Sequence, residues 1–150
     1  MKSIKGTTLL EVIVTIVILS GLFLVTNILL VNYYNVSKKI SAFNETKEDV
    51  DIIYRLFENC VTAANKQKEK LKIEFLREEH TMISLEESNT YIEFLYDELG
   101  NIYSYYNGNY IKTIMHIKDI QITLEENLLK LVIRSKDNKT YRKNYYVINV

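Results

Sequence analysis

The chain begins with Met1-Lys-Ser-Ile-Lys-Gly6, and residues 7–31 read TTLLEVIVTIVILSGLFLVTNILLV. This apolar run is long enough to cross a bilayer as a helix, which takes roughly 20 residues. Its only formal charge is Glu11, near its beginning. A carboxylate at membrane depth costs roughly 2.5–3.5 kcal/mol on insertion scales, so its presence predicts a function and a partner for it. Lys2 and Lys5 precede the run, and by the positive-inside rule they keep the leader in the cytoplasm while the rest is exported.

An α-amino group is the natural partner for the Glu11 carboxylate. Cleavage after Gly6 would leave Thr7 as the first residue, with a free amine, and Glu11 as the fifth. In a helix these residues rise by about 6 Å and the amine points back along the axis, so it cannot easily reach the carboxylate of its own chain. A neighbouring copy, shifted along a filament axis, can supply the amine. We therefore expect processing at Gly6 and Thr7, and subunit docking at Glu11.

This start resembles the type IV prepilin and pseudopilin family. The family has a basic leader, a Gly, an aromatic-Thr-Leu-Ile/Leu-Glu start and a long apolar stretch, and the matching residues here are Gly6, Thr8, Leu9, Leu10 and Glu11. Thr7 departs from the usual Phe at the new amino terminus. The resemblance implies cleavage and N-methylation by a membrane prepilin peptidase and storage in the cytoplasmic membrane. It also implies extraction into a filament of pilin-like subunits by a membrane assembly platform and its ATPase.

Two ordinary kinds of targeting segment fit this start less well. A cleaved secretory signal has its site after the apolar core, with small residues at the last and third-last positions. No such site appears as the core runs on through Leu29, Leu30 and Val31. A simple signal anchor would have the right length, but it would not explain a Gly placed five residues before a lone Glu.

Length, charge and cysteine content limit the remaining possibilities. The 150 residues suffice for one domain besides the membrane segment. Removal of residues 1–6 leaves 17 basic and 19 acidic side chains, a net charge of −2 that argues against a general polyanion binder. The single cysteine, Cys60, cannot form an intramolecular disulfide, so an exported domain would depend on packing alone. We expect Cys60 to be a small buried hydrophobic residue.

The predicted helix continues well past the membrane segment, from Thr7 to about Asn65. No proline interrupts it, and beyond Tyr34 apolar residues recur in alternating steps of four and three, which is the period of one helix face. The stripe consists of Val36, Ile40, Phe43, Lys47, Val50, Tyr54, Phe57, Val61 and Ala64. The charged residues of this region are expected mostly on the solvent side, namely Lys38, Lys39, Glu45, Glu48, Asp49 and Asp51.

Short runs with strand character follow the polar segment 65–70. They are Leu71–Leu76, Thr81–Leu85, Tyr91–Tyr96, Ile102–Tyr106, Tyr110–Ile114, Ile117–Leu124, Leu128–Arg134 and Thr140–Val150. Turn signals separate several of them, at 97–101, 107–109, 125–127 and 136–139. Alternation in 120–124 and 129–134 predicts one packed and one solvated face.

These patterns together predict an α+β fold, and the resemblance implies that it is pilin-like. A long N-terminal helix, transmembrane in its lower half, packs its upper half on an antiparallel β-sheet. Residues 1–6 are then a prepilin leader, 7–31 the transmembrane and filament-core helix, and 32–150 an extracytoplasmic head whose amphipathic helix continues to about 65. The expected location is a single-pass protein of the cytoplasmic membrane that reaches the cell surface or cell wall once it is assembled into a filament.

The last strands are also similar to minor pseudopilin heads of the ComGF type in Gram-positive competence systems. Residues 120–133 have the form Ile-x-Ile-x-Leu-Glu-Glu-Asn-x-Leu-x-Leu-x-Ile, and 140–147 the form Thr-Tyr-x-x-x-Tyr-Tyr-Val. This resemblance implies a minor pseudopilin for DNA uptake. The alternatives are a minor pilin of a twitching or adhesive type IV pilus and a pseudopilin of type II secretion. A membrane-anchored extracellular binding module that never polymerises is the alternative from another class.

No catalytic set or cofactor motif is evident in the sequence. His80 and His116 lack metal-ligand spacing to Cys60 or to each other, and we expect them to be structural. The acidic turns lack the repeated ligands of a calcium loop. No glycine-rich phosphate loop and no nucleophile elbow occurs. We therefore expect no enzymatic activity, no cofactor and no metal.

One local basic cluster surrounds the predicted turn at 136–139. It consists of Arg134, Lys136, Lys139, Arg142 and Lys143, with Tyr141 among them and only Asp137 opposing. Such a tip can contact the phosphates of double-stranded DNA, and it can equally be a solvated turn that protects an edge strand from aggregation. The 12 tyrosines suit stacking on nucleic acid or carbohydrate, but Tyr is also favoured in strands with one solvated face.

Overall fold

The computed structural model describes residues 9–77 and 80–148. The chain divides into two units, one that ends at Phe43 and a compact head, Asn44–Val150. One α-helix and eight β-strands make up the described residues, in the order α1 (Leu9–Gln67), β1 (Leu71–Arg77), β2 (His80–Leu85), β3 (Tyr91–Tyr96), β4 (Ile102–Tyr106), β5 (Asn109–Ile114), β6 (Ile117–Glu125), β7 (Leu128–Ser135) and β8 (Thr140–Tyr146). The predicted helix and all eight predicted strands are confirmed, with ends that differ by a few residues.

Helix α1 ends two residues later than the sequence predicts, in a defined C-terminal cap. Lys68 takes a left-handed backbone conformation with φ of 58°. The next amide, that of Glu69, donates to the carbonyl of Ala64 at 3.1 Å. This is the hydrogen bond of a Schellman motif, which satisfies one of the carbonyl groups left open at a helix end.

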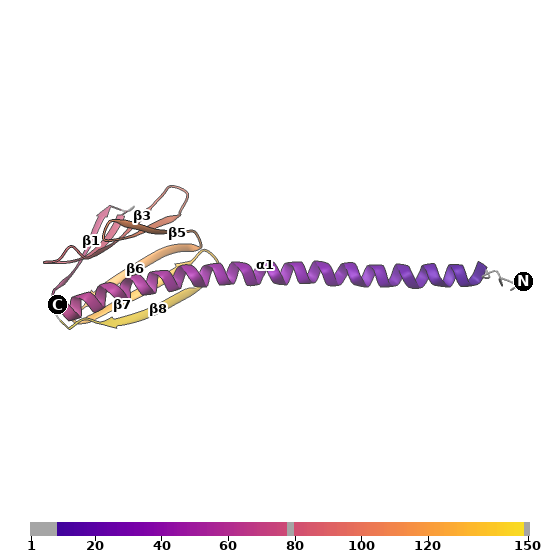
Figure 1. Cartoon of the computed structure of the whole chain (residues 1–150), viewed down its shortest axis with the longest axis horizontal. Coiled ribbons are helices and arrows are strands. Elements are labelled where there is room, and N and C mark those ends of the chain that lie inside the picture. Colours follow the sequence, from indigo (N-terminus) through magenta and orange to yellow (C-terminus); the bar gives the residue numbers. More distant parts are fainter. Residues whose placement is uncertain (1–8, 78–79, 149–150) are drawn as a thin grey trace, which may run out of the picture. The chain divides into compact units, whose positions relative to one another are not determined.

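The strands form two antiparallel sheets, whereas the sequence predicts one. Strands β1 to β5 form a five-stranded sheet in sequence order, and β6 to β8 form a three-stranded sheet (Figure 1). The short link Met115–His116 carries the chain from the first sheet to the second. Strand periodicity shows which face of a strand is packed, but it does not identify the neighbouring strand. The number of sheets could therefore not be predicted from it.

The core of the head lies where α1 meets both sheets (Figure 1). The Phe57 ring is fully buried and stacks on Phe94 of β3 at a centroid distance of 6.0 Å. Its other neighbour is Tyr145 of β8, at 6.2 Å. The Tyr145 hydroxyl also donates to the Tyr54 carbonyl of α1 at 3.0 Å. One aromatic residue of the helix therefore joins the two sheets.

The buried face of α1 is wider than the single predicted stripe. Of that stripe, Val50, Phe57, Val61 and Ala64 are buried as predicted. A second line of buried residues runs beside it at steps of three and four, namely Thr46, Asp49, Ile53, Leu56 and Cys60. A helix that packs on two sheets buries two neighbouring stripes, so the prediction of a single stripe was wrong.

Two further expectations about the helix need correction. Val36, Ile40 and Phe43 of the predicted stripe are 55%, 54% and 47% exposed, because burial on α1 begins only at Thr46, within the head. Asp49 was expected on the solvent side and is only 2% exposed. The other charged residues assigned to the solvent side are exposed: Lys38, Lys39, Glu45, Glu48 and Asp51.

Candidate functional site

The unit that ends at Phe43 carries the candidate membrane and docking segment. From Leu9 to Val31 its large apolar side chains are all exposed, and the segment is long and apolar enough to cross a membrane. Glu11 lies in the first turn of α1 with its side chain exposed. The predicted processing residues, Gly6 and Thr7, lie outside the described residues.

The uncharged polar side chains of this segment donate hydrogen bonds to the helix itself. Those of Thr15, Ser20, Thr26 and Asn27 each donate to the carbonyl four residues earlier, at 2.7 to 2.8 Å. Such bonds reduce the cost of placing a hydroxyl or amide group at membrane depth. Glu11 is then the one residue in 9–31 whose charge has to be accommodated in an apolar environment.

The structure does not bring the predicted basic cluster together on one surface. Lys143 lies on the side of β8 that faces α1, where its amine is 3.3 Å from Glu58 and about 5 Å from the rings of Tyr54 and Tyr145. Arg142 is exposed on the opposite face, because neighbouring residues of a strand point to opposite sides. The sheet therefore separates Lys143 from the exposed members of the cluster.

Lys139, at the turn, is neutralised locally. Its amine lies 2.6 Å from Asp137, a carboxylate that also accepts a hydrogen bond from Ser135. The hydrogen bond from Lys139 is the main cause that lowers the pKa of Asp137 to about 2, with Ser135 second, so this carboxylate stays charged at any physiological pH. Arg134, Lys136 and Arg142 then remain as the exposed basic residues on which a phosphate contact would depend.

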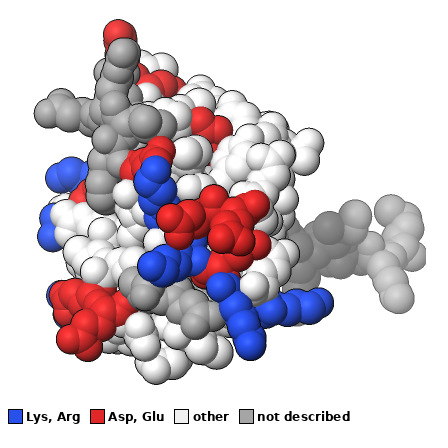
Figure 2. Space-filling model, turned by 90° about the vertical axis from the view of Figure 1, so that its left-hand side faces the viewer, with Lys and Arg blue, Asp and Glu red and all other residues white. Residues whose placement is uncertain are grey.

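The face of the head drawn in Figure 2 carries mixed charge. In the view of Figure 2, Lys and Arg side chains lie among Asp and Glu side chains, and the blue atoms form no continuous area. A surface that binds polyanions by charge would need such an area.

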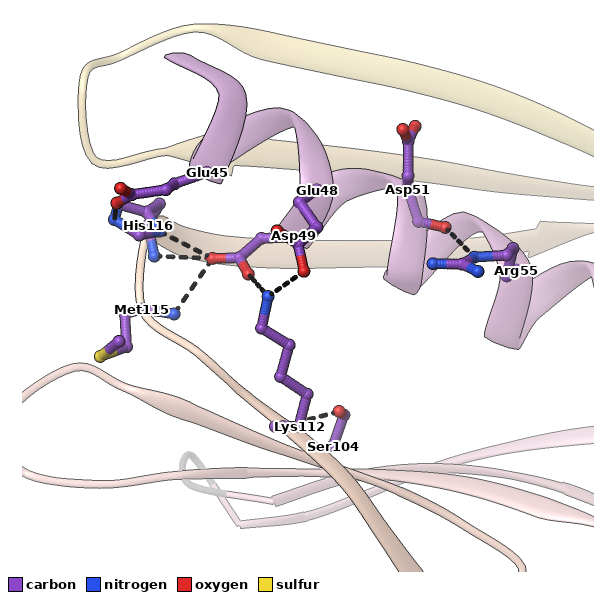
Figure 3. A network of polar contacts seen from close by, with 9 residues as sticks. All are labelled: Glu45, Glu48, Asp49, Asp51, Arg55, Ser104, Lys112, Met115 and His116. Carbon is purple, nitrogen blue, oxygen red and sulfur yellow. Dashed lines mark hydrogen bonds and ion pairs between the residues drawn. The ribbon is translucent and has the colours of Figure 1, made fainter. Parts of the chain in front are cut away.

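A buried carboxylate that sequence reasoning missed lies at the link between the two sheets (Figure 3). Asp49 of α1 accepts hydrogen bonds from the backbone amides of Met115 and His116, at 3.2 and 3.1 Å. The same oxygen is 3.0 Å from Nδ1 of His116, and the other oxygen is 3.2 Å from the amine of Lys112. His116 also reaches Glu45, 3.1 Å from its Nε2.

This network attaches the link between the sheets to the helix. A buried carboxylate is tolerated only when its oxygens are paired and hydrogen-bonded, and Asp49 has both kinds of partner. Hydrogen bonding to Glu48 is the main cause that raises the pKa of Lys112, so its amine stays charged beside Asp49. Asp49 lies three residues after Thr46 and four before Ile53, so it belongs to the second stripe of α1. This spacing is the pattern in the sequence that could have predicted its burial.

The other singled-out residues have structural surroundings. Cys60 is 1% exposed, which confirms the expectation, and burial raises the pKa of its thiol to about 12. His80 and His116 are both half-buried, and Nε2 of His80 lies 2.7 Å from Glu93. Within residues 9–77 and 80–148, no group of three or more His, Cys, Asp or Glu is placed to hold a metal ion.

The described residues thus offer Glu11 and the surfaces of the head as candidate contacts with other molecules. No family model, curated protein or solved structure matches the chain. Its function has to be inferred from its own residues.

Proposed function

We propose that this protein is a minor pseudopilin subunit of a type IV filament-type machine that serves DNA uptake in competence. The observation that carries the proposal is the position of Glu11. It is the single charge in an exposed apolar helical segment, and it follows a basic leader that ends at Gly6. A docking contact with the terminal amine of a neighbouring subunit gives this otherwise costly charge a role.

The two units of the chain have different roles in such a subunit. The exposed apolar side chains of residues 9–31 need an apolar environment, which is lipid during storage and the helices of other subunits after assembly. The head has its own core and carries the surfaces that meet other subunits outside the membrane. The partners are then pilin-like subunits, the prepilin peptidase, and the assembly platform with its ATPase.

Processing is the first test of this proposal. We expect the mature protein purified from native membranes to begin at Thr7, with or without a methyl group on its amine, because Gly6 is followed by a Glu-bearing apolar helix. Intact-mass measurement reads this directly, and a strain without the prepilin peptidase provides the control that starts at Met1. A chain that starts at Met1 in a strain with active peptidase would instead favour the membrane-anchored binding module.

The DNA-uptake part of the proposal rests on the resemblance, and direct DNA contact is tested separately. We expect that charge reversal at Lys136, Lys139 and Arg142 leaves transformation and DNA retention unchanged, because Lys139 is already paired with Asp137 and Lys143 lies on the other face of β8, against Glu58. Lys143 is left intact because its reversal would oppose Glu58. A phosphate contact would show itself as weaker retention with a reduced salt dependence.

A further inference from the structure

Strand β5 differs from the other edge strands of the head. The two sheets have four edges, β1, β5, β6 and β8. Three of them carry charged side chains that are exposed: Lys72 on β1, Lys118 on β6 and Arg142 on β8. Exposed charge is a common device that keeps an edge strand from pairing with another chain. The only charged residue of β5 is Lys112, and its amine is held by Glu48 and Asp49 of α1, at 2.9 and 3.2 Å (Figure 3).

Exposed apolar side chains gather at this same edge. Tyr110 and Ile111 of β5 are 55% and 44% exposed, and Met115, just beyond the strand, is 55% exposed. In the described residues of the head, the other exposed large hydrophobic side chains are Leu99, Tyr146 and Ile148. An exposed apolar group beside open backbone hydrogen-bonding positions is typical of a surface that another protein covers.

A groove adjoins the edge. It has a volume of about 380 Å³ and lies between α1 and strands β4 and β5. Its lining is mostly apolar, from Ile52, Leu56, Tyr106 and Ile111, with Arg55, Asn59 and Lys112 as the polar members. A groove of this kind accepts an apolar side chain of a partner whose backbone pairs with the edge.

The charge in the groove indicates what the partner carries. Lys112 is already neutralised by two carboxylates of α1. Arg55 donates from Nε to the carbonyl of Asp51 at 3.4 Å, and its guanidinium forms no ion pair with another described residue (Figure 3). A guanidinium at the rim of an apolar groove favours a carboxylate, which it can bind with two parallel hydrogen bonds.

We propose that β5 and the adjoining groove form the docking surface for an extended strand of a neighbouring filament subunit. The incoming strand adds to the edge of the five-stranded sheet, places an apolar side chain in the groove and offers a carboxylate to Arg55. The proposal rests on the proposed function for the identity of the partner. Because a minor subunit is sparse in a filament, the partner is a different pilin-like subunit and not a second copy of this chain.

The first test compares the same substitution on two edge strands of the full-length protein. We expect Tyr110→Glu to lower incorporation into sheared filaments by about tenfold or more, because the partner would have to bury an unpaired charge. Tyr146→Glu on β8 is the matched control, since Tyr146 is 64% exposed and also lies on an edge strand. It should incorporate as wild type. Both variants should melt close to wild type, as surface substitutions usually do.

The second test identifies the partner through an introduced thiol. Cys60 is buried, so in an Ile111→Cys protein the new thiol at the β5 edge is the one that reacts. A short thiol-to-amine cross-linker applied to filaments should join it to another pilin-like subunit of the same filament. A product made of two copies of this chain, or none, overturns the proposed partner.

The outcomes separate this proposal from the proposed function. If Glu11→Gln blocks incorporation while Tyr110→Glu incorporates normally, the edge is not a docking surface and the filament function stands. If the wild-type protein is never found in a filament, the proposed function fails, and the docking proposal fails with it. Loss of incorporation for both Tyr110→Glu and Tyr146→Glu also overturns the proposal, because the effect would then not be specific to β5.

Discussion

A Glu11→Gln variant should reach the membrane and be processed normally but fail to enter filaments. The substitution removes the charge and keeps the shape, so membrane insertion becomes easier and the monomer level should stay normal or rise slightly. Cleavage should persist, because on the prepilin interpretation the peptidase depends on Gly6. What is lost is the attraction between the Glu11 carboxylate and the amine of the preceding subunit, which in an apolar bundle is screened by little water.

Incorporation is measured as the amount of the protein in sheared filaments relative to the membrane, together with transformation. Glu98→Gln provides a matched control, since Glu98 is an exposed residue in the turn between β3 and β4. The control should behave as wild type in both assays. Wild-type incorporation and activity of Glu11→Gln at wild-type expression would show that Glu11 is not the docking contact or that no filament is involved.

A Phe57→Ala variant should unfold the head or weaken it severely. Truncation of a buried Phe typically costs about 3–5 kcal/mol, which is comparable to the whole stability of a small domain. The loss should be in the upper part of this range, because the Phe57 ring is fully buried between Phe94 of one sheet and Tyr145 of the other. Removal of the ring therefore loosens both sheets from α1.

The measurement is the melting temperature of a soluble fragment that begins at Asn35, followed by circular dichroism. Phe43→Ala in the same fragment is the matched control, because it removes the same ring from a position that is 47% exposed. We expect a small change for the control and loss of the cooperative transition for Phe57→Ala. Equal melting temperatures of the two variants would contradict the packing of α1 described above.

Local patterns in the sequence were sufficient for the elements of this fold. The 3.6-residue period and the absence of proline predict α1, and alternation with turn residues predicts the eight strands. Several turns have left-handed residues where the sequence places Asn or Gly, as at Asn107, Gly108 and Asn138, with φ of 51°, 76° and 65°. These preferences act within a few residues of the chain, so they can be recognised without knowing what packs on them.

The arrangement of the elements was decided by contacts between residues far apart in the chain. Phe57 joins the two sheets through Phe94 and Tyr145, and Asp49 is buried because amides that lie 66 and 67 residues later need an acceptor. The same holds for Lys143, whose side of β8 became the packed one because it lies against Glu58 of α1, 85 residues earlier.

The long apolar helical segment and the place of Glu11 within it could thus be recognised from the sequence, since hydropathy and charge are properties of composition. Which residues of the head meet, and which edge remains uncharged, depended on the tertiary structure. A period of two or of 3.6 residues in the sequence identifies the buried face of a strand or helix. Which element packs on that face, and which strand is left at the edge of a sheet, as β5 is, is determined only when the whole core packs.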